Sequence, residues 1–340
     1  MAKFINTAEI RNMKTLITGA NGFVGSAVLR LLANEGHNVR ALVRHGSDRR
    51  NFKGIDVEIV EGDLRDTESL KRAVTGCNTL FHIAADYRLW IPDPDTMYKT
   101  NVDGTRELII AATDAGVEKI VYTSSVATLG LNNNGTASDE TTPVSIENML
   151  GHYKRSKYLA EKEINKLVQE KSCPVIIVNP STPVGPRDIK PTPTGKIVLD
   201  TLRHRMPAYV DTGLNIVHVD DVAKGHLLAF EKGEIGERYI LGGDNMTLAS
   251  ILEYICISQD MSPPTIKLPH NLIIPVAWMM ERIANITHKE PRATVDSVRM
   301  SKKIMFFSSA KAKEKLGYQS RPGIEGLKDA IDWFNTENYP

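Results

Sequence analysis

The sequence predicts an α/β fold in which a doubly wound parallel sheet carries helices on both faces and is followed by a smaller C-terminal α/β domain. In the first half of the chain, strand-like segments that are apolar throughout alternate with helix-like segments, which is typical of parallel sheets covered on both faces. A glycine turn separates the first strand from the first helix. The alternation of strand-like and helix-like segments ends at Pro180. Residues 180–195 contain five prolines and two glycines, which predicts a loop.

Each expected element follows from its local pattern. Gly36 ends the first helix, which begins near residue 25, and Asp66 is a plausible N-cap for a short helix over 66–74. Further helices are expected at about 95–115, 149–170 and 222–233, with others near the C-terminus. Strands are expected at 14–20, 38–44, 57–63, 78–85, 119–125, 174–180, 215–221 and 238–243.

The pattern divides the chain into two interleaved domains. Its 340 residues can bury one large core or two modest ones. We expect residues 13–180 to form the first domain and residues 181–340 to form mainly the second, smaller one. Residues 215–230 are expected to return to the main sheet, which would interleave the two.

Composition and charge argue against several classes of protein. The net charge is +1, from 42 basic and 41 acidic side chains, so nucleic acid is not an expected partner. Cys77, Cys173 and Cys256 lie far apart without a Cys-x-x-Cys pair, which argues against disulfides and zinc and fits a reducing cytoplasm. Residues 1–12 lack the apolar core of a signal peptide, and no apolar run approaches the ~18 residues of a membrane span. The apolar stretch 272–286 is interpreted as a helix packed on the second domain rather than a membrane contact.

The adjacent residues His218, Asp220 and Asp221 raise the question of a metal site. The simpler interpretation is a strand end whose aspartates cap the following helix. The nine histidines show no ligand spacing and there is no His-Glu-x-x-His, so no metal is expected.

The glycine turn is the first candidate functional feature. Gly19, Gly22 and Gly25 are spaced Gly-x-x-Gly-x-x-Gly, between a strand and a helix. Glycines at such a turn let backbone N–H groups approach a pyrophosphate, which larger side chains would hold away. The turn therefore predicts a dinucleotide cofactor.

The end of the second strand bears on which dinucleotide binds. An acidic residue about 20 positions after the turn would bond the ribose hydroxyls of NAD. This chain has Arg44 there, with Arg49 and Arg50 nearby, and a guanidinium binds a 2′-phosphate bidentately. Residues 13–180 are therefore expected to be an NADP-binding domain, with NAD possible, and residues 181–340 mainly a substrate-binding domain. The alternative is that Arg44 is simply an exposed arginine of a loop. Asp63 is placed either for the adenine edge or for helix capping.

Tyr153 and Lys157 are the candidate catalytic pair. They are four residues apart on a predicted helix, which places both side chains on one face. A tyrosine with a pKa near ~10 is a poor proton donor or acceptor at neutral pH, but a nearby ammonium stabilises the phenolate. The spacing gains weight because it follows the glycine turn and the segment TSSVATLG.

The motifs TGANGFVG, GDL, HIAA, TSSVATLG, YKRSK and VHVDDVA occur here in the order seen in the extended short-chain dehydrogenases/reductases, which the chain resembles from about residue 13 onward. Segments such as DYRLWIPDPDTMY and VNPSTPVGPRDIKPTPTG look like the hopanoid-associated sugar epimerase group, which is itself similar to the dihydroflavonol-4-reductases. The resemblance implies a Rossmann-type fold and a role in hopanoid-related metabolism. It also implies a homodimer paired through the two long helices.

The resemblance also implies roles for individual residues. Ser125 would hydrogen-bond the substrate oxygen, Tyr153 would be the general acid/base, and Lys157 its electrostatic partner. Ser124 would then face the cofactor or the core. The implied cofactor contacts are Gly19, Asn21, Gly22, Phe23, Val24, Gly25, Arg44, Asp63, Leu64, Ala84, Ala85, Ser124, Tyr153, Lys157, Pro180 and Thr182.

The sequence leaves two activities open. One is reduction of a ketone or aldehyde by NADPH. The other is epimerisation of a nucleotide sugar, which oxidises and re-reduces one carbon and commonly uses NAD. A third alternative, a protein that senses NADP and has lost catalysis, is disfavoured because Ser125, Tyr153 and Lys157 are all present. Reduction is favoured because Arg44 favours NADP and because the segment DTGLNIVHVDD lacks an arginine that often holds the nucleotide in such epimerases. The residues outside the trio that bear on the substrate are Tyr87 and Trp90, which suit an apolar or ring-shaped ligand, and Arg187, Arg292 and Arg299, which could grip phosphates.

Overall fold

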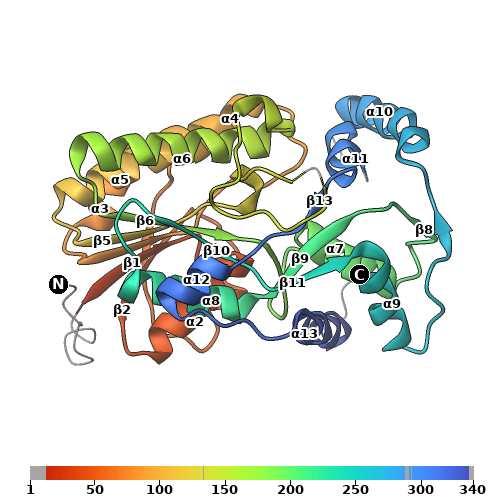
Figure 1. Ribbon diagram of the computed structural model, residues 1–340. Helices are drawn as coiled ribbons and strands as arrows, with labels where there is room; N and C mark the ends of the chain where they lie inside the picture. The colour runs from red at the N-terminus through yellow and green to blue at the C-terminus, as the bar shows by residue number, and fades with distance from the viewer. Residues whose placement is uncertain (1–12, 133, 288–290, 292, 337–340) are drawn as a thin grey trace.

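The computed structural model describes residues 13–132, 134–287, 291 and 293–336. Its larger unit is a seven-stranded sheet in the order β10-β6-β5-β4-β1-β2-β3 (Figure 1). Every neighbouring pair in this sheet is parallel, which confirms the expected fold class. The strands are β1 (Lys14–Thr18), β2 (Asn38–Val43), β3 (Glu58–Glu61), β4 (Thr79–His82), β5 (Lys119–Thr123), β6 (Val175–Pro180) and β10 (Arg238–Leu241).

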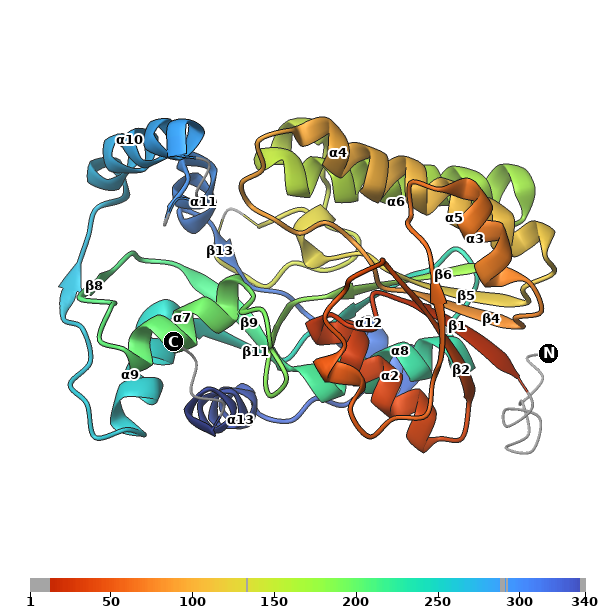
Figure 2. The same cartoon turned by 180° about the vertical axis from the view of Figure 1, so that it is seen from behind.

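Helices cover both faces of this sheet, as Figures 1 and 2 show from opposite sides. Each face has its own apolar core, one containing Leu32 and Phe230 and the other Leu108 and Ile164, all buried. One layer consists of α3 (Thr67–Val74), α5 (Thr105–Asp114) and α6 (Gly151–Lys171), with α4 (Pro94–Tyr98) leading toward α5; the other consists of α2 (Phe23–Asn34), α8 (Val219–Lys232) and α12 (Ala310–Leu316). The N-cap expected at Asp66 is confirmed, because its carboxylate accepts hydrogen bonds from the first turn of α3.

The strand order reverses beside β1, which places the functional edge of the sheet. The chain runs from β1 through β2 to β3 on one side, then crosses to β4 on the other side of β1. In an open parallel sheet, ligands bind at the carboxyl ends of the strands at such a switch point. Thr18 and His82 are register partners at these ends of β1 and β4.

The smaller unit is built around β9 (Gly213–His218). This strand pairs with β11 (Asp244–Thr247) antiparallel and with β13 (Ile304–Met305) and β7 (Thr182–Val184) parallel. Ile216, Leu327 and Phe334 belong to its buried core. The surrounding elements are α7 (Pro193–Leu202), α9 (Leu248–Ile257), α13 (Gly323–Thr336), and the short pair β8 (Ala208–Tyr209) and β12 (Ile266–Lys267).

Two expectations about this half of the chain were wrong in part. The strand in 215–230 does not return to the main sheet: β9 pairs within the smaller sheet, whereas α8 covers the main one and β10 joins it. The units are interleaved, but through α8 and β10. The expected loop at 180–195 contains β7 and the start of α7, because Pro193 occupies the first helical turn, where its missing N–H costs nothing.

The apolar segment predicted as a packed helix forms α10 (His270–Thr287) together with the neighbouring α11 (Val295–Ser301). Ala277 and Ala284 are buried on its inner face, but Leu272 and Ile286 on the outer face are 68% and 81% exposed. The helix is therefore packed on one side only. Among the described residues, no helix is both long and apolar enough to cross a membrane.

Candidate active site

The glycine turn closes tightly over the switch point. Gly19 has φ +72°, a left-handed conformation that favours glycine, and a Cβ there would lie 2.7 Å from the backbone nitrogen of Ala84. A Cβ on Gly25 would lie 2.0 Å from the carbonyl oxygen of Gly19. Helix α2 then begins at Phe23 with no side-chain cap and no acidic residue in its first turn. Its N–H groups, with Asn21, Gly22 and Val24 around them, therefore fit a pyrophosphate.

A buried hydrogen-bond chain fixes the strand ends beneath this turn. His82 Nδ1 lies 2.8 Å from the Thr18 hydroxyl oxygen, and its Nε2 lies 2.9 Å from the Thr105 hydroxyl. Burial and, to a lesser extent, the nearby Lys157 ammonium lower the pKa of His82 to about 3, so the ring is neutral. The Thr18 hydroxyl also accepts from the Ala84 N–H at 3.1 Å. This chain places Ala84 and the following Ala85, both half-buried, beside the glycine turn.

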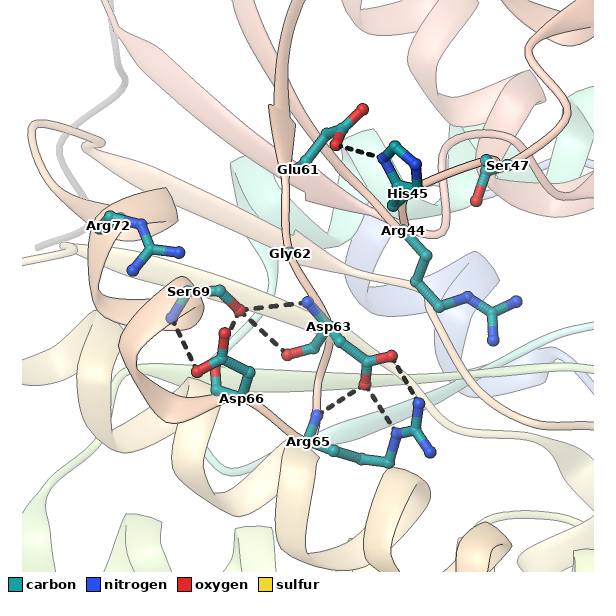
Figure 3. A pocket seen from close by; sticks show the side chains of 11 residues that line it. Arg44, His45, Ser47, Glu61, Gly62, Asp63, Arg65, Asp66, Ser69 and Arg72 are labelled. Carbon is teal, nitrogen blue, oxygen red and sulfur yellow. Dashed lines mark hydrogen bonds and ion pairs between the residues drawn. The ribbon is translucent and has the colours of Figure 1, made fainter.

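Arg44 lines an open hollow of about 600 Å³ beyond the end of β2 (Figure 3). Two neighbouring arginines are already paired: Arg49 with Glu61 at 2.9 Å and Arg50 with Asp48 at 2.7 Å. Arg44 is exposed, and within the part of the chain that the structure describes its guanidinium makes no hydrogen bond or ion pair. Its guanidinium is therefore free to take an anionic ligand.

Asp63 borders the same hollow, and helix capping is not its role. Its carboxylate accepts from the Arg65 backbone and Nε, both at 2.9 Å, while Asp66 caps the helix. Hydrogen bonds from the Arg65 side chain hold the pKa of Asp63 below its usual value. Leu64, expected at the cofactor, is buried in the core against α5, so only its backbone is positioned near the edge of the sheet.

Helix α6 carries Tyr153 and Lys157, and it brings Lys157 to Tyr122 and Thr123 at the carboxyl end of β5. Burial raises the pKa of Tyr153, and a hydrogen bond with the Ser125 hydroxyl lowers it. Ser125 and Tyr153 therefore lie close together, whereas the expected contact of Tyr153 with Lys157 stays a prediction. Ser125 is half-buried, and its hydroxyl also accepts from the Ala127 N–H at 3.1 Å, at the start of a short 3-10 helix over Val126–Thr128.

Lys157 is buried, and its ammonium is held by two protein oxygens. Its Nζ donates to the Tyr122 hydroxyl and to the Thr123 carbonyl, both at 2.8 Å. An ammonium has three hydrogens, so one remains for Tyr153 or a cofactor hydroxyl. Burial lowers the pKa of Lys157 to about 7, and the Glu161 carboxylate opposes this effect.

Ser124 faces the core, the second of the two alternatives that the sequence left open. Its hydroxyl donates to the carboxylate of Glu161 rather than pointing toward the cofactor edge. Sequence reasoning missed Glu161 and Tyr122. The one available signal for Glu161 is its position four residues after Lys157, on the same helix face.

A third missed residue is Asn101, which ties the loop after β4 to α6. Its amide accepts from the Asp86 N–H at 2.7 Å and donates to the Asp86 carbonyl at 2.8 Å and to the Ser156 hydroxyl at 2.9 Å. The loop so held carries Tyr87, which is exposed, and Trp90, which is half-buried. Their expected contact with substrate stays a prediction.

The other candidates lie around β6, β7 and α8. Pro180 ends β6 and Thr182 begins β7, so both border the carboxyl edge. Arg187 is paired with Asp220 and Arg299 lies 3.9 Å from Asp296, whereas Arg292 lies outside the described residues.

His218 caps α8, because its ring nitrogen accepts from the Asp220 N–H, and Asp221 forms an ion pair with Arg321. The cluster is therefore structural, as expected. The expected capping aspartates were wrong, since the cap is His218. The described residues contain no group of ligands that could hold a metal ion.

A doubly wound sheet with a glycine cradle at its switch point is the framework of dinucleotide-binding enzymes. The chain belongs to the NAD-dependent epimerase/dehydratase family, whose model matches residues 15–242. This confirms the resemblance to the extended short-chain dehydrogenases/reductases and makes the protein an enzyme of a family that uses a nicotinamide dinucleotide.

Three relatives place the chain within that family. It is 42% identical over 327 residues, 95% of each chain, to a Synechocystis sp. protein with the provisional name dihydroflavonol 4-reductase. It is 33% identical over 324 residues to sterol demethylase protein B of Methylococcus capsulatus, covering 95% of this chain and 98% of that one. The crystal structure of gox2253 matches with a TM-score of 0.86 and 56% identity, over 96% of this chain and 99% of that one.

Proposed function

We propose that the protein is an NADPH-dependent reductase of a ketone or aldehyde. The observation that carries the proposal is that Ser125 lies next to Tyr153, and that Lys157, one helical turn further on, is hydrogen-bonded at the carboxyl end of β5. The glycine cradle, where a Cβ would overlap backbone atoms, lies at the same edge of the sheet. Acid/base chemistry of this kind needs a proton donor, a group that lowers its pKa and a hydrogen-bond donor for the developing oxyanion.

The glycine cradle and the open first turn of α2 suit a dinucleotide, because a Cβ at Gly19 or Gly25 would overlap backbone atoms. A bound reduced nicotinamide supplies a hydride to the carbonyl carbon. Tyr153 then gives its proton to the carbonyl oxygen, which yields the alcohol. Ser125 donates a hydrogen bond to that oxygen as its negative charge develops. Lys157 stabilises the phenolate that Tyr153 becomes.

Arg44 supports NADP over NAD within this proposal. Its guanidinium is unpaired at the end of β2, while the neighbouring Arg49 and Arg50 are occupied by carboxylates. A 2′-phosphate would provide the bidentate acceptor that a guanidinium matches. In this scheme Asp63 lies on the adenine side of the same hollow.

The proposed substrate has an apolar or ring-shaped body. Tyr87 and Trp90 offer flat surfaces on the loop held by Asn101, and two relatives carry names that refer to a flavonoid and to a sterol. A polycyclic lipid of hopanoid type fits the same description. The competing activity is epimerisation of a sugar, against which stands the absence of an arginine in residues 211–217.

The nucleotide that co-purifies with the protein gives a first test. Exchangeable NADP(H) supports a reductase, because the cofactor must leave after each turnover. Tightly retained NAD(H), with no NADPH binding on titration, would contradict the proposal and favour an epimerase. The expected pairing of two copies through the long helices stays a prediction, which the mass of the protein in solution would test.

A further inference from the structure

A buried carboxylate lies one helical turn beyond Lys157. Glu161 is 4% exposed, and burying a charged group is costly unless it is paired and hydrogen-bonded. Its Oε1 accepts from Arg238 of β10 at 3.0 Å. Its Oε2 accepts from the Asn179 amide at 3.2 Å and from the Ser124 hydroxyl, and lies 2.9 Å from the Thr128 hydroxyl. One side chain of α6 is thus bonded to the segment after β5, to β6 and to β10.

The partners of Glu161 also hold the backbone of Ser125. The Asn179 amide donates to the Ser125 carbonyl at 3.0 Å, and the Thr128 hydroxyl lies 2.8 Å from the same oxygen. A hydroxyl has one hydrogen, so Thr128 donates either to that carbonyl or to Glu161 at any moment. The Asn179 amide has two hydrogens and donates to both groups, so Glu161 is linked to the Ser125 carbonyl through one intervening side chain, while its own helix carries Tyr153.

The charge of Glu161 acts on Lys157 as well. The groups that act on the Lys157 ammonium are Tyr122 from β5, which accepts its hydrogen bond, His82 from β4, and Glu161 from its own helix. His82 is neutral because of its lowered pKa, and burial raises the pKa of Tyr122 well above its usual value, so that group is neutral too. Glu161 therefore supplies the negative charge that opposes the desolvation of the ammonium.

We propose that Glu161 is a positioning residue: its hydrogen bonds fix Ser125 in register with Tyr153, and its carboxylate, one helical turn beyond Lys157, is the counter-charge of that ammonium. This inference rests on the proposed function of the trio. It adds that the trio is incomplete without a fourth side chain that touches neither substrate nor cofactor.

The charge arm of the proposal is tested without any substrate. The Lys157 titration is followed by NMR of protein labelled with ¹³C at lysine Cε, and Lys157→Met assigns the signal. In Glu161→Gln the Lys157 midpoint should fall by about one pH unit, from the loss of a nearby charge screened as in a protein interior. Thr128→Val, the matched control, removes one hydrogen-bond donor but no charge and should leave the midpoint in place. An unchanged midpoint in Glu161→Gln would overturn the electrostatic role.

The geometric arm is tested by kinetics with NADPH and an accepted carbonyl. Glu161→Gln should lower kcat by ten-fold or more with little change in NADPH affinity, and its loss of activity with rising pH should begin at lower pH. Glu161→Asp keeps the charge and should restore the wild-type pH profile while recovering part of kcat.

A purely structural role would instead lower activity equally at every pH, in proportion to lost thermal stability, and that outcome would contradict the proposal. If Glu161→Gln does not fold, the test uses the pH profiles of Glu161→Asp and Thr128→Val instead. The proposal then requires that Glu161→Asp keep the wild-type midpoint of the Lys157 titration. If no variant, wild type included, reduces any carbonyl, the proposed function fails, while the NMR titration still reports on Glu161.

Discussion

Replacing Arg44 by aspartate should reverse the preference for the phosphorylated cofactor. Arg44 is exposed and lacks a protein partner among the described residues, so its whole donor set is available to a 2′-phosphate. A charge-assisted bidentate contact contributes about 1.5–3 kcal/mol, which corresponds to a change in NADPH affinity of about 10- to 150-fold. The exposure of the site favours the lower end of that range, and added salt should reduce the effect further.

The assay is titration of nicotinamide fluorescence with NADPH and with NADH, for the wild type and for Arg44→Asp. NADPH affinity should fall by at least ten-fold while NADH affinity is unchanged or improves, because the aspartate can accept from the ribose hydroxyls. Arg49→Ala is the matched control, since Arg49 is already paired with Glu61 at 2.9 Å. Equal affinities for both cofactors in the wild type, or an equal loss in Arg49→Ala, would refute the reasoning.

Three further predictions concern the trio and the cradle. Tyr153→Phe should lower kcat by about 10²–10⁴ with cofactor affinity nearly intact, because the ring stays and the proton donor goes; a variant with most of the wild-type turnover would contradict this. Gly25→Ala should weaken NADPH binding and lower the melting temperature, because its Cβ would lie 2.0 Å from a backbone oxygen. The control is Gly76→Ala, where φ is +75° and the space around the Cβ is open; it should lower stability but leave cofactor affinity unchanged. Lys157 is protonated in the unfolded chain up to about pH 10.4 but only to about pH 7 when folded. The free energy of unfolding should therefore rise with pH between those values by about 1.4 kcal/mol per pH unit. Lys157→Met should lose that slope in denaturant titrations, and a retained slope would exclude Lys157 as its source.

The main elements of the fold were predictable because they depend on local pattern. Uniformly apolar strands, the glycine turn and the N-cap at Asp66 each carry their physical reason in a few adjacent residues. The place of β9 was not predictable in this way. Its sequence is as apolar as that of a main-sheet strand, and its pairing with β7, β11 and β13 depends on residues far away in the chain.

The candidate site was likewise predictable only in part. Helical spacing alone predicts that Tyr153 and Lys157 lie on one face of their helix. Arg49, Arg50 and Asp63 form ion pairs, and these pairs leave the Arg44 guanidinium available in the hollow. Such pairs depend on side-chain positions in the folded chain, so the sequence did not predict them. The role of Ser124 was left open because the carboxylate that receives its hydrogen bond is 37 residues further on.

The measurement that tests the central claim most directly follows nicotinamide absorbance at 340 nm while the protein meets a panel of carbonyl compounds and a panel of UDP- and dTDP-sugars. The proposed reductase should oxidise one NADPH per alcohol formed from carbonyls with an apolar or ring-shaped body, and Tyr153→Phe should abolish that signal. Sugar nucleotides should remain unchanged. Inversion of a sugar at catalytic cofactor levels, with no carbonyl reduced, would contradict the account.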